Sequence, residues 1–292
     1  MRRRTALLTG LALAAGSLPA LALGSVEALQ APVTFTSAAL PTYQTNGIAW
    51  AVASAQGKVF VGGTFSKVRP PATAAGVNET TRTNLVVLDA ATGSPTSCAP
   101  AVTGGSGTVR ALAASPDGRT MYVGGSFSSI GGVGRSNIAA IDVASCTVVS
   151  TFKPSPSATV RAIKATTTKV FYGGDLTSVS GTARKYAAAS GAVGQANEGA
   201  LLSWAAQLSL NVRSINTKPD DSVVVIGGNF DTVNGVQSNR LVVVDSSTGT
   251  TNVKTYTGLQ NERSVVNSIA VDSTGFYTGN DGTQGFDGRE AY

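Results

Sequence analysis

The stretch Val59-Phe60-Val61-Gly62-Gly63-Thr64-Phe65 decides the fold, because copies of it return along the chain. Each copy is an apolar triplet, a glycine pair, a small polar residue and an apolar residue. Further full copies begin at Met121, Val170 and Val224, and a weaker one begins at Phe276. Successive first glycines are 62, 49, 54 and 52 residues apart, and such a period predicts a repeat architecture.

The other landmarks of each repeat also return in order. A glycine-containing loop, as in 129–133, follows the glycine pair, and an apolar run closed by Asp, as in 138–142, comes next. A Val-Arg run and a hairpin turn, as in 109–112 and 115–118, lead to the following copy. Each unit therefore holds about four short β-branched or aromatic runs separated by turn residues, with no sustained helical period. Four antiparallel strands per roughly 50-residue unit predict an all-β chain folded as the blades of a β-propeller.

The motif resembles the delta-60 repeat family of bacterial β-propellers, whose units carry an apolar triplet, Gly-Gly-x-Phe, a Gly loop and a later Asp-Gly turn. The match covers Ile48 to Asn280 and is best from Met121 to Asp142. The pattern also looks like the head of secreted actinobacterial proteins, in which such a propeller precedes adhesive or carbohydrate-associated modules. A kelch-like propeller ranks second, because the regularly placed downstream Tyr and Trp of kelch units are missing here.

Two departures from the repeat affect the domain boundaries. The third unit reads Lys-Tyr-Ala-Ala-Ala-Ser-Gly at 185–191, where other units have a strand closed by Asp, so its outer strands are uncertain. From Ile48 to Tyr292 there are 245 residues, which at this period make about 4.7 units. We therefore assign residues 1–28 to a signal peptide, 29–47 to an N-terminal segment, and 48–292 to propeller repeats truncated in the fifth unit.

The first residues have the pattern of an export signal. Three arginines follow Met1, an apolar run extends from Ala6 to Leu18, and a small-residue pattern at 20–22 follows Pro19. The apolar run is shorter than the ~20 residues that cross a bilayer, so we expect no membrane span after cleavage. This pattern predicts a secreted or cell-surface protein.

Composition excludes several kinds of chemistry. The chain has no His among its 292 residues, which removes Ser-His-Asp and Cys-His triads and His-ligated metals. Removal of residues 1–28 takes away three Arg and one Glu, so the net charge falls from +6 to +4. This mild excess has no Lys/Arg runs with interleaved aromatics, so we expect no nucleic-acid partner. We also expect no cofactor, no metal and no catalytic residue.

Three arginines occupy the same place in successive units, namely Arg110, Arg161 and Arg213. Propeller symmetry would set them at equal radius around one axis, where one acidic ligand could contact all three. Alternatively, each arginine pairs with an aspartate of its own unit, which would neutralise it locally. The sequence leaves both interpretations open.

Two further features are candidates for a binding or structural role. Cys98 and Cys146 are the only cysteines, and an exported chain permits them to form a disulfide between neighbouring units, although two free buried thiols are an equal alternative. The first unit is 13 residues longer than the second. The excess lies between Arg69 and Arg82 and contains Glu79, so it is either a ligand-contacting loop or a tolerated surface loop.

Carboxylates that recur in every unit indicate a structural role. Asp at the ends of equivalent strands and in equivalent hairpin turns is expected to accept hydrogen bonds from its own turn. These aspartates are Asp89, Asp117, Asp142, Asp220, Asp221, Asp245 and Asp272. The acids outside this set include Asp175, Asp231 and Glu198, and they would carry any activity toward polysaccharide.

The function expected from the sequence is a secreted or surface β-propeller that binds without catalysis. Its expected partner is a cell-wall or extracellular polysaccharide or a surface protein. The alternatives are a polysaccharide-active enzyme that uses carboxylates at the propeller mouth, and a purely structural head of a longer surface protein. The fold follows from the repeat, whereas the ligand does not.

Overall fold

The computed structural model describes residues 41–250, 254–255, 265–281 and, for the backbone alone, 289–291. The predicted signal peptide and most of the predicted N-terminal segment lie outside these residues. The described residues belong to one compact unit, Pro41–Tyr292, and they contain strands but no helix.

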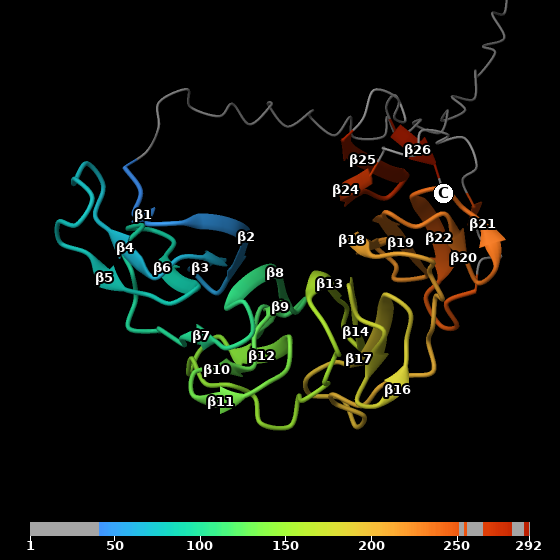
Figure 1. Cartoon of the computed structure of the whole chain (residues 1–292), viewed down its shortest axis with the longest axis horizontal. Helices are drawn as coiled ribbons and strands as arrows, with labels where there is room; N and C mark the ends of the chain where they lie inside the picture. The colour runs from blue at the N-terminus through green and yellow to red at the C-terminus, as the bar shows by residue number, and fades with distance from the viewer. Residues whose placement is uncertain (1–40, 251–253, 256–264, 282–288, 292) are drawn as a thin grey trace, which may run out of the picture. The chain divides into compact units, whose positions relative to one another are not determined.

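Each repeat forms an antiparallel sheet of an inner, a middle and an outer strand (Figure 1). The inner strands are β2 (Ile48–Ala55), β8 (Thr108–Ala114), β13 (Val160–Ala165), β18 (Val212–Thr217) and β24 (Val265–Val271). The middle strands, which contain the motif, are β3 (Lys58–Thr64), β9 (Thr120–Ser126), β14 (Lys169–Gly174), β19 (Val223–Gly228) and β25 (Gly275–Asp281). The outer strands are β6 (Leu85–Asp89), β12 (Ile138–Asp142), β17 (Ala187–Gly191), β22 (Leu241–Asp245) and β26 (Arg289–Ala291).

The predicted fourth strand is short. It is present as β23 (Lys254–Thr255), which pairs with β22 in the fourth unit. In the first three units the corresponding segment pairs through single bridges, which are Leu88 with Pro95, Ile141 with Val148 and Ser190 with Leu201. The third unit forms its outer strand β17 without a closing Asp, because this segment is fully buried and pairs along its length with β14.

A small hairpin separates the middle from the outer strand in the first four units. These hairpins are β4 (Lys67–Arg69) with β5 (Thr80–Thr81), β10 (Ser129–Ile130) with β11 (Val133–Gly134), β15 (Ser178–Val179) with β16 (Thr182–Ala183), and β20 (Thr232–Val233) with β21 (Val236–Gln237). Asn234 and Gly235 have φ values of +50° and +79°, as a tight two-residue hairpin turn requires. Two more short strands, β1 (Gln44–Thr45) and β7 (Val102–Thr103), pair with β4 and β10.

Successive units pack face to face, and the core lies between them. Each inner strand contacts the inner strand of the next unit, in the order β2, β8, β13, β18 and β24. The largest apolar clusters combine side chains of two neighbouring units, as where Phe171 of the third unit packs with Ile226 of the fourth. This stacking of antiparallel units is the architecture of a β-propeller.

The glycine pairs allow close approach between neighbouring units and between strands of one unit. A Cβ built on Gly124 would lie 2.7 Å from Cγ1 of Val160 in the next unit, and the first glycines of the other full motifs face the same contact. A Cβ on Gly125 would lie 1.9 Å from the carbonyl oxygen of Thr108. Close approach, and not positive φ, is therefore what these glycines provide.

Candidate functional site at the bulges of the inner strands

Every inner strand has a bulge at the same place. The register between inner and middle strand shifts by one residue, for example between Val109 and Ala111, which leaves Arg110 unpaired. The residues at this place in the five units are Trp50, Arg110, Arg161, Arg213 and Asn267. A bulge redirects the side chain of its extra residue. Each of the three predicted arginines is the extra residue of such a bulge.

Arg110 lies against an aromatic ring instead of a carboxylate. Its Cζ is 4.1 Å from the ring centroid of Trp50 in the preceding unit. Partial burial, followed by the positive charges of Arg161 and Arg213, lowers the pKa of Arg110, while Asp175 opposes this shift. The guanidinium stays charged at neutral pH. The charges of Arg161 and Arg213 therefore act on Arg110, and convergence of the three arginines on one ligand stays a prediction.

Arg161 has a carboxylate partner in its own unit. Its Nε and Nη2 donate to the two oxygens of Asp175 at 2.8 and 2.7 Å, and Asn211 donates to the same carboxylate at 3.0 Å. Burial alone would raise the pKa of Asp175, but these hydrogen bonds and the charges of Arg161 and Arg213 hold it below its usual value. This arginine follows the locally paired interpretation, although its partner is not one of the repeated turn aspartates.

Arg213 has no such partner among the residues that the structure describes. Within the described part of the chain it makes no hydrogen bond or ion pair, and its Nε is buried without an acceptor. Asp281, which holds the place of Asp175 in the fifth unit, accepts the Val265 N–H at 2.9 Å. Two of the three arginines thus lack a carboxylate partner among the described residues, and the locally paired interpretation holds for Arg161 only.

Sequence reasoning missed two parts of this site, Trp50 and Asn211. The signal for Trp50 is present in the chain, because Ala49-Trp50-Ala51 aligns with the Val-Arg-Ala triplet at 109–111 when the units are superimposed by strand register. Asn211 precedes the third arginine by two residues, and only the stacking of the third and fourth units brings it to Asp175.

The turn aspartates have the structural role that their repetition predicts. Asp89 Oδ1 accepts the N–H groups of Ala91 and Thr92, and Asp245 Oδ1 accepts those of Ser247 and Thr248. Asp142, Asp117, Asp220, Asp221 and Asp272 likewise accept hydrogen bonds within their own turns. The hydrogen bond from the Ser247 hydroxyl, followed by the one from the Thr248 N–H, lowers the pKa of Asp245 to about 2.

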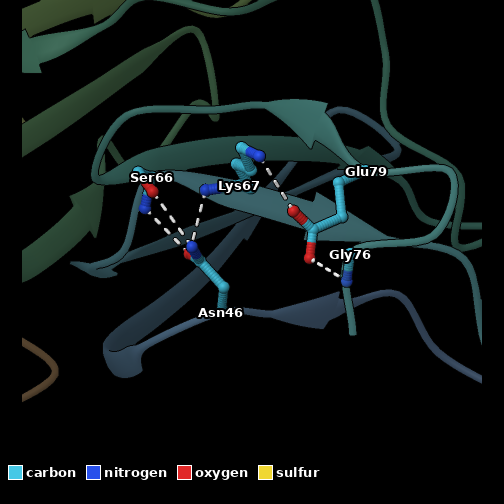
Figure 2. A network of polar contacts seen from close by, with 5 residues as sticks. All are labelled: Asn46, Ser66, Lys67, Gly76 and Glu79. Carbon is cyan, nitrogen blue, oxygen red and sulfur yellow. Dashed lines mark hydrogen bonds and ion pairs between the residues drawn. The ribbon is translucent and has the colours of Figure 1, made fainter. Parts of the chain in front are cut away.

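Glu79 of the predicted ligand loop is engaged within the first unit (Figure 2). Glu79 accepts the Gly76 N–H at 2.8 Å and lies 3.1 Å from Nζ of Lys67, and the hydrogen bond from Gly76 is the main reason that the pKa of Glu79 is lowered. Arg69 donates to Gln44 at 2.9 Å. Glu79 thus holds the extra segment closed, and a ligand role for this loop stays a prediction.

Arg82 belongs to a structural set instead. It donates to the carbonyl of Thr96, and Arg135 and Arg184 donate to the carbonyls of Val149 and Leu202 at the same place in the next two units. Because an arginine at this place joins the outer segment to its own unit in three successive units, we assign it a structural role.

The two cysteines come together as a disulfide. Cys98 and Cys146 are joined with their Cα atoms 5.5 Å apart. Cys98 is buried in the cluster between the first and second units, so the bond links these units at their outer side.

The acids of the enzymatic alternative have separate partners. Asp175 is bound by Arg161, Asp231 lies 2.7 Å from Arg240, and Glu198 accepts hydrogen bonds from Thr151 and Gly194. No group of three or more His, Cys, Asp or Glu able to hold a metal occurs in the described ranges. The described ranges also contain no helix long and apolar enough to cross a membrane.

The comparison with family models agrees with the fold. A family model described as "Domain of unknown function (DUF5122) beta-propeller" matches residues 115–139. The crystal structure of the WD40 beta propeller domain of Doa1 is similar with a TM-score of 0.49 and 14% identity, over 84% of this chain and 66% of that chain. A search of curated proteins found no match. The fold is a β-propeller, and these matches carry no statement about a ligand.

Proposed function

We propose that this chain is an exported, non-catalytic β-propeller of the delta-60 repeat kind that binds acidic polysaccharide through Arg110, Arg161 and Arg213. The observation that carries the proposal is that a repeated bulge presents three arginines while Arg110 and Arg213 have no carboxylate partner among the described residues. A guanidinium that the fold leaves unpaired keeps its donors for a carboxylate supplied from outside.

Trp50 and Asp175 complete the site. Trp50 is 45% exposed and lies against Arg110, so it provides both a cation–π contact and an accessible ring face. Asp175 fixes the orientation of Arg161 through two parallel hydrogen bonds. The export pattern at residues 1–28 and the disulfide support an extracellular location, because disulfides persist in oxidising compartments.

Binding of polygalacturonate at several salt concentrations tests the proposal. The variant carrying Arg110→Gln, Arg161→Gln and Arg213→Gln should bind about tenfold or more weakly, since each exposed ion pair contributes about 0.5 kcal/mol and 1.4 kcal/mol is tenfold. The binding of the unaltered chain should weaken steeply with salt, because exposed charges are screened over ~10 Å at 0.1 M.

A charge-matched control separates a site from a general charge effect. Replacing the exposed cations Arg119, Lys153 and Lys185 with Gln removes the same charge away from the bulges and should leave binding nearly unchanged. Unchanged binding in the bulge variant, or an equal loss in the control, would contradict the proposal. Appearance of the processed chain in the medium of an expressing bacterium tests the export signal separately.

A further inference from the structure

A lysine at the start of the middle strand closes the junction between two units. Lys58 and Lys169 hold the same register, opposite the last residue of their outer strands. Lys58 Nζ donates to the carbonyl of Val143 in the second unit, and Lys169 Nζ donates to the carbonyl of Ser246 in the fourth unit at 2.8 Å. Each lysine thus spans from its own unit to the turn after the next outer strand.

The junction between the second and third units lacks this lysine. Thr120 holds the same register, opposite Asp142, and its side chain is too short to reach across. A cavity of about 590 Å³ lies there, lined by residues of both units. Such a volume is within the range of small-molecule sites, roughly 300–1,000 Å³.

Tyr122 places an unused donor at this cavity. The whole residue, hydroxyl included, is buried at the wall of the cavity, and its hydroxyl oxygen accepts the Val193 N–H at 2.9 Å. Burial is the main cause that raises the pKa of Tyr122 to about 12, so the hydroxyl keeps its proton at neutral pH. No acceptor for that proton occurs in the described ranges. Phe60, Phe171 and Val225 hold this place in the first, third and fourth units, and Tyr277 holds it in the fifth unit. Among the junctions between described units, the hydroxyl therefore occurs at this one alone.

The remaining lining favours an uncharged polar ligand. Asp117 and Asp142 at the cavity already accept hydrogen bonds within their own turns, and Arg119 lies beside Asp117 with an N–O distance of 3.9 Å. Pro116 and Val193 provide apolar wall, which suits the C–H face of a sugar ring. A lining with one unused donor, apolar side chains and charges of both signs does not select for a charged molecule.

We propose that this cavity is a second binding site, which takes a neutral sugar of one or two rings whose hydroxyl or carbonyl oxygen accepts the Tyr122 O–H. The site lies toward the start of β9, whereas the bulge of Arg110 lies opposite its end. It is therefore separate from the arginine site, and its occupation does not depend on acidic groups of a ligand.

The repeat itself supplies the test. Thr120→Lys introduces the side chain that closes the neighbouring junctions, and Val223→Lys is the matched control, because Val223 holds the same register in the fourth unit. N-acetylglucosamine and lactose serve as probes, with binding followed by saturation-transfer NMR and titration calorimetry. At least one sugar should bind to the unaltered chain and to Val223→Lys, and Thr120→Lys should weaken this binding about tenfold or more with no loss of melting temperature.

A second variant tests the donor and keeps the proposal testable if Thr120→Lys does not fold. Tyr122→Phe removes the hydroxyl and should weaken sugar binding about fivefold, the loss expected for one neutral hydrogen bond. The triple arginine variant should bind the sugar as the unaltered chain does, which distinguishes this site from the acidic-polymer site. Absence of binding by both sugars, full binding to Thr120→Lys or Tyr122→Phe, or an equal loss in Val223→Lys would overturn the proposal.

Discussion

The first unit and the interior units have the same pattern of strands, but the inner strand is exposed in the first unit and buried in the interior units. Val52 in β2 and Ile215 in β18 hold the same register against their middle strands, yet Val52 is 65% exposed and Ile215 is 7% exposed. Ile48 and Trp50 of β2 are also exposed, whereas Val109, Val160 and Val212 of the interior inner strands are fully buried.

The difference lies in the neighbour and not in the strand. Val212 is covered by the third unit, where Gly173 leaves room for it, and no described unit precedes β2 in the chain. An inner strand is thus buried by the preceding unit, in which the first glycine of the motif leaves room for a side chain of that strand. The first unit gains its stability from one side, through the second unit, the lysine contact of Lys58 and the disulfide.

The largest expected effect comes from removal of this covalent link. Replacing Cys98 and Cys146 with Ser should lower the free energy of unfolding by about 4 kcal/mol in the chain-entropy model, for a sequence separation of 48 residues. The loss should be concentrated in the first unit, so hydrogen exchange should accelerate in β2 and β3 and stay unchanged in β18 and β19. Two titratable thiols in the unreduced, unfolded protein would contradict the bond.

The next prediction concerns Gly125, the second glycine of the motif, which lets β9 lie close to β8. Gly125→Ala should cost about 3 kcal/mol, because the new methyl group would lie 1.9 Å from the backbone oxygen of Thr108, which cannot move aside cheaply. Gly134→Ala is the control, since a Cβ there has no neighbour within 4 Å. Thermal denaturation should show a lower melting temperature for the first variant only, and equal curves would mean that close approach is not what the glycine serves.

A pair of truncations tests the difference in exposure directly. Ile215→Ala should cost about 2 kcal/mol through lost burial and the cavity it leaves, whereas Val52→Ala should change stability by less than about 0.5 kcal/mol. Urea denaturation of both variants measures these values. A cost at Val52 as large as that at Ile215 would show that the face of β2 is covered in solution.

The smallest effect concerns the bulge position of the inner strands. This position holds Arg161, which pairs with the Asp175 carboxylate, in the third unit and Trp50 in the first unit. The pKa of Asp175 is lowered in the folded chain. The ionised carboxylate therefore stabilises the fold at a pH above the unfolded pKa of Asp175, and this contribution is lost as the pH falls through the folded pKa. Asp175→Asn should therefore cost about 1 kcal/mol at pH 6, and this cost should shrink as the pH falls through the folded pKa of Asp175. The difference should persist in an Arg110→Gln background, and a pH-independent difference would contradict the ion pair.

Much of the fold could be predicted because its signals are local. The hairpin turns, the aspartates that accept hydrogen bonds two or three residues away, and the alternation of strands are all properties of short segments. The Ala-rich segment 187–191 was uncertain for the same reason, because its strand depends on pairing with β14 and on burial, and neither can be seen in the segment itself.

The sequence by itself determined the repeat, its all-β units, the turn aspartates and the equivalence of Arg110, Arg161 and Arg213. Only the tertiary structure decided that Arg161 is paired while Arg213 has no partner among the described residues, that Trp50 lies against Arg110, and that Thr120 leaves a cavity beside Tyr122. The physical reason is the distance along the chain. A turn aspartate finds its partner within about three residues, whereas the contacts of Tyr122 with Val193 and of Lys58 with Val143 span 71 and 85 residues and form only when neighbouring units stack.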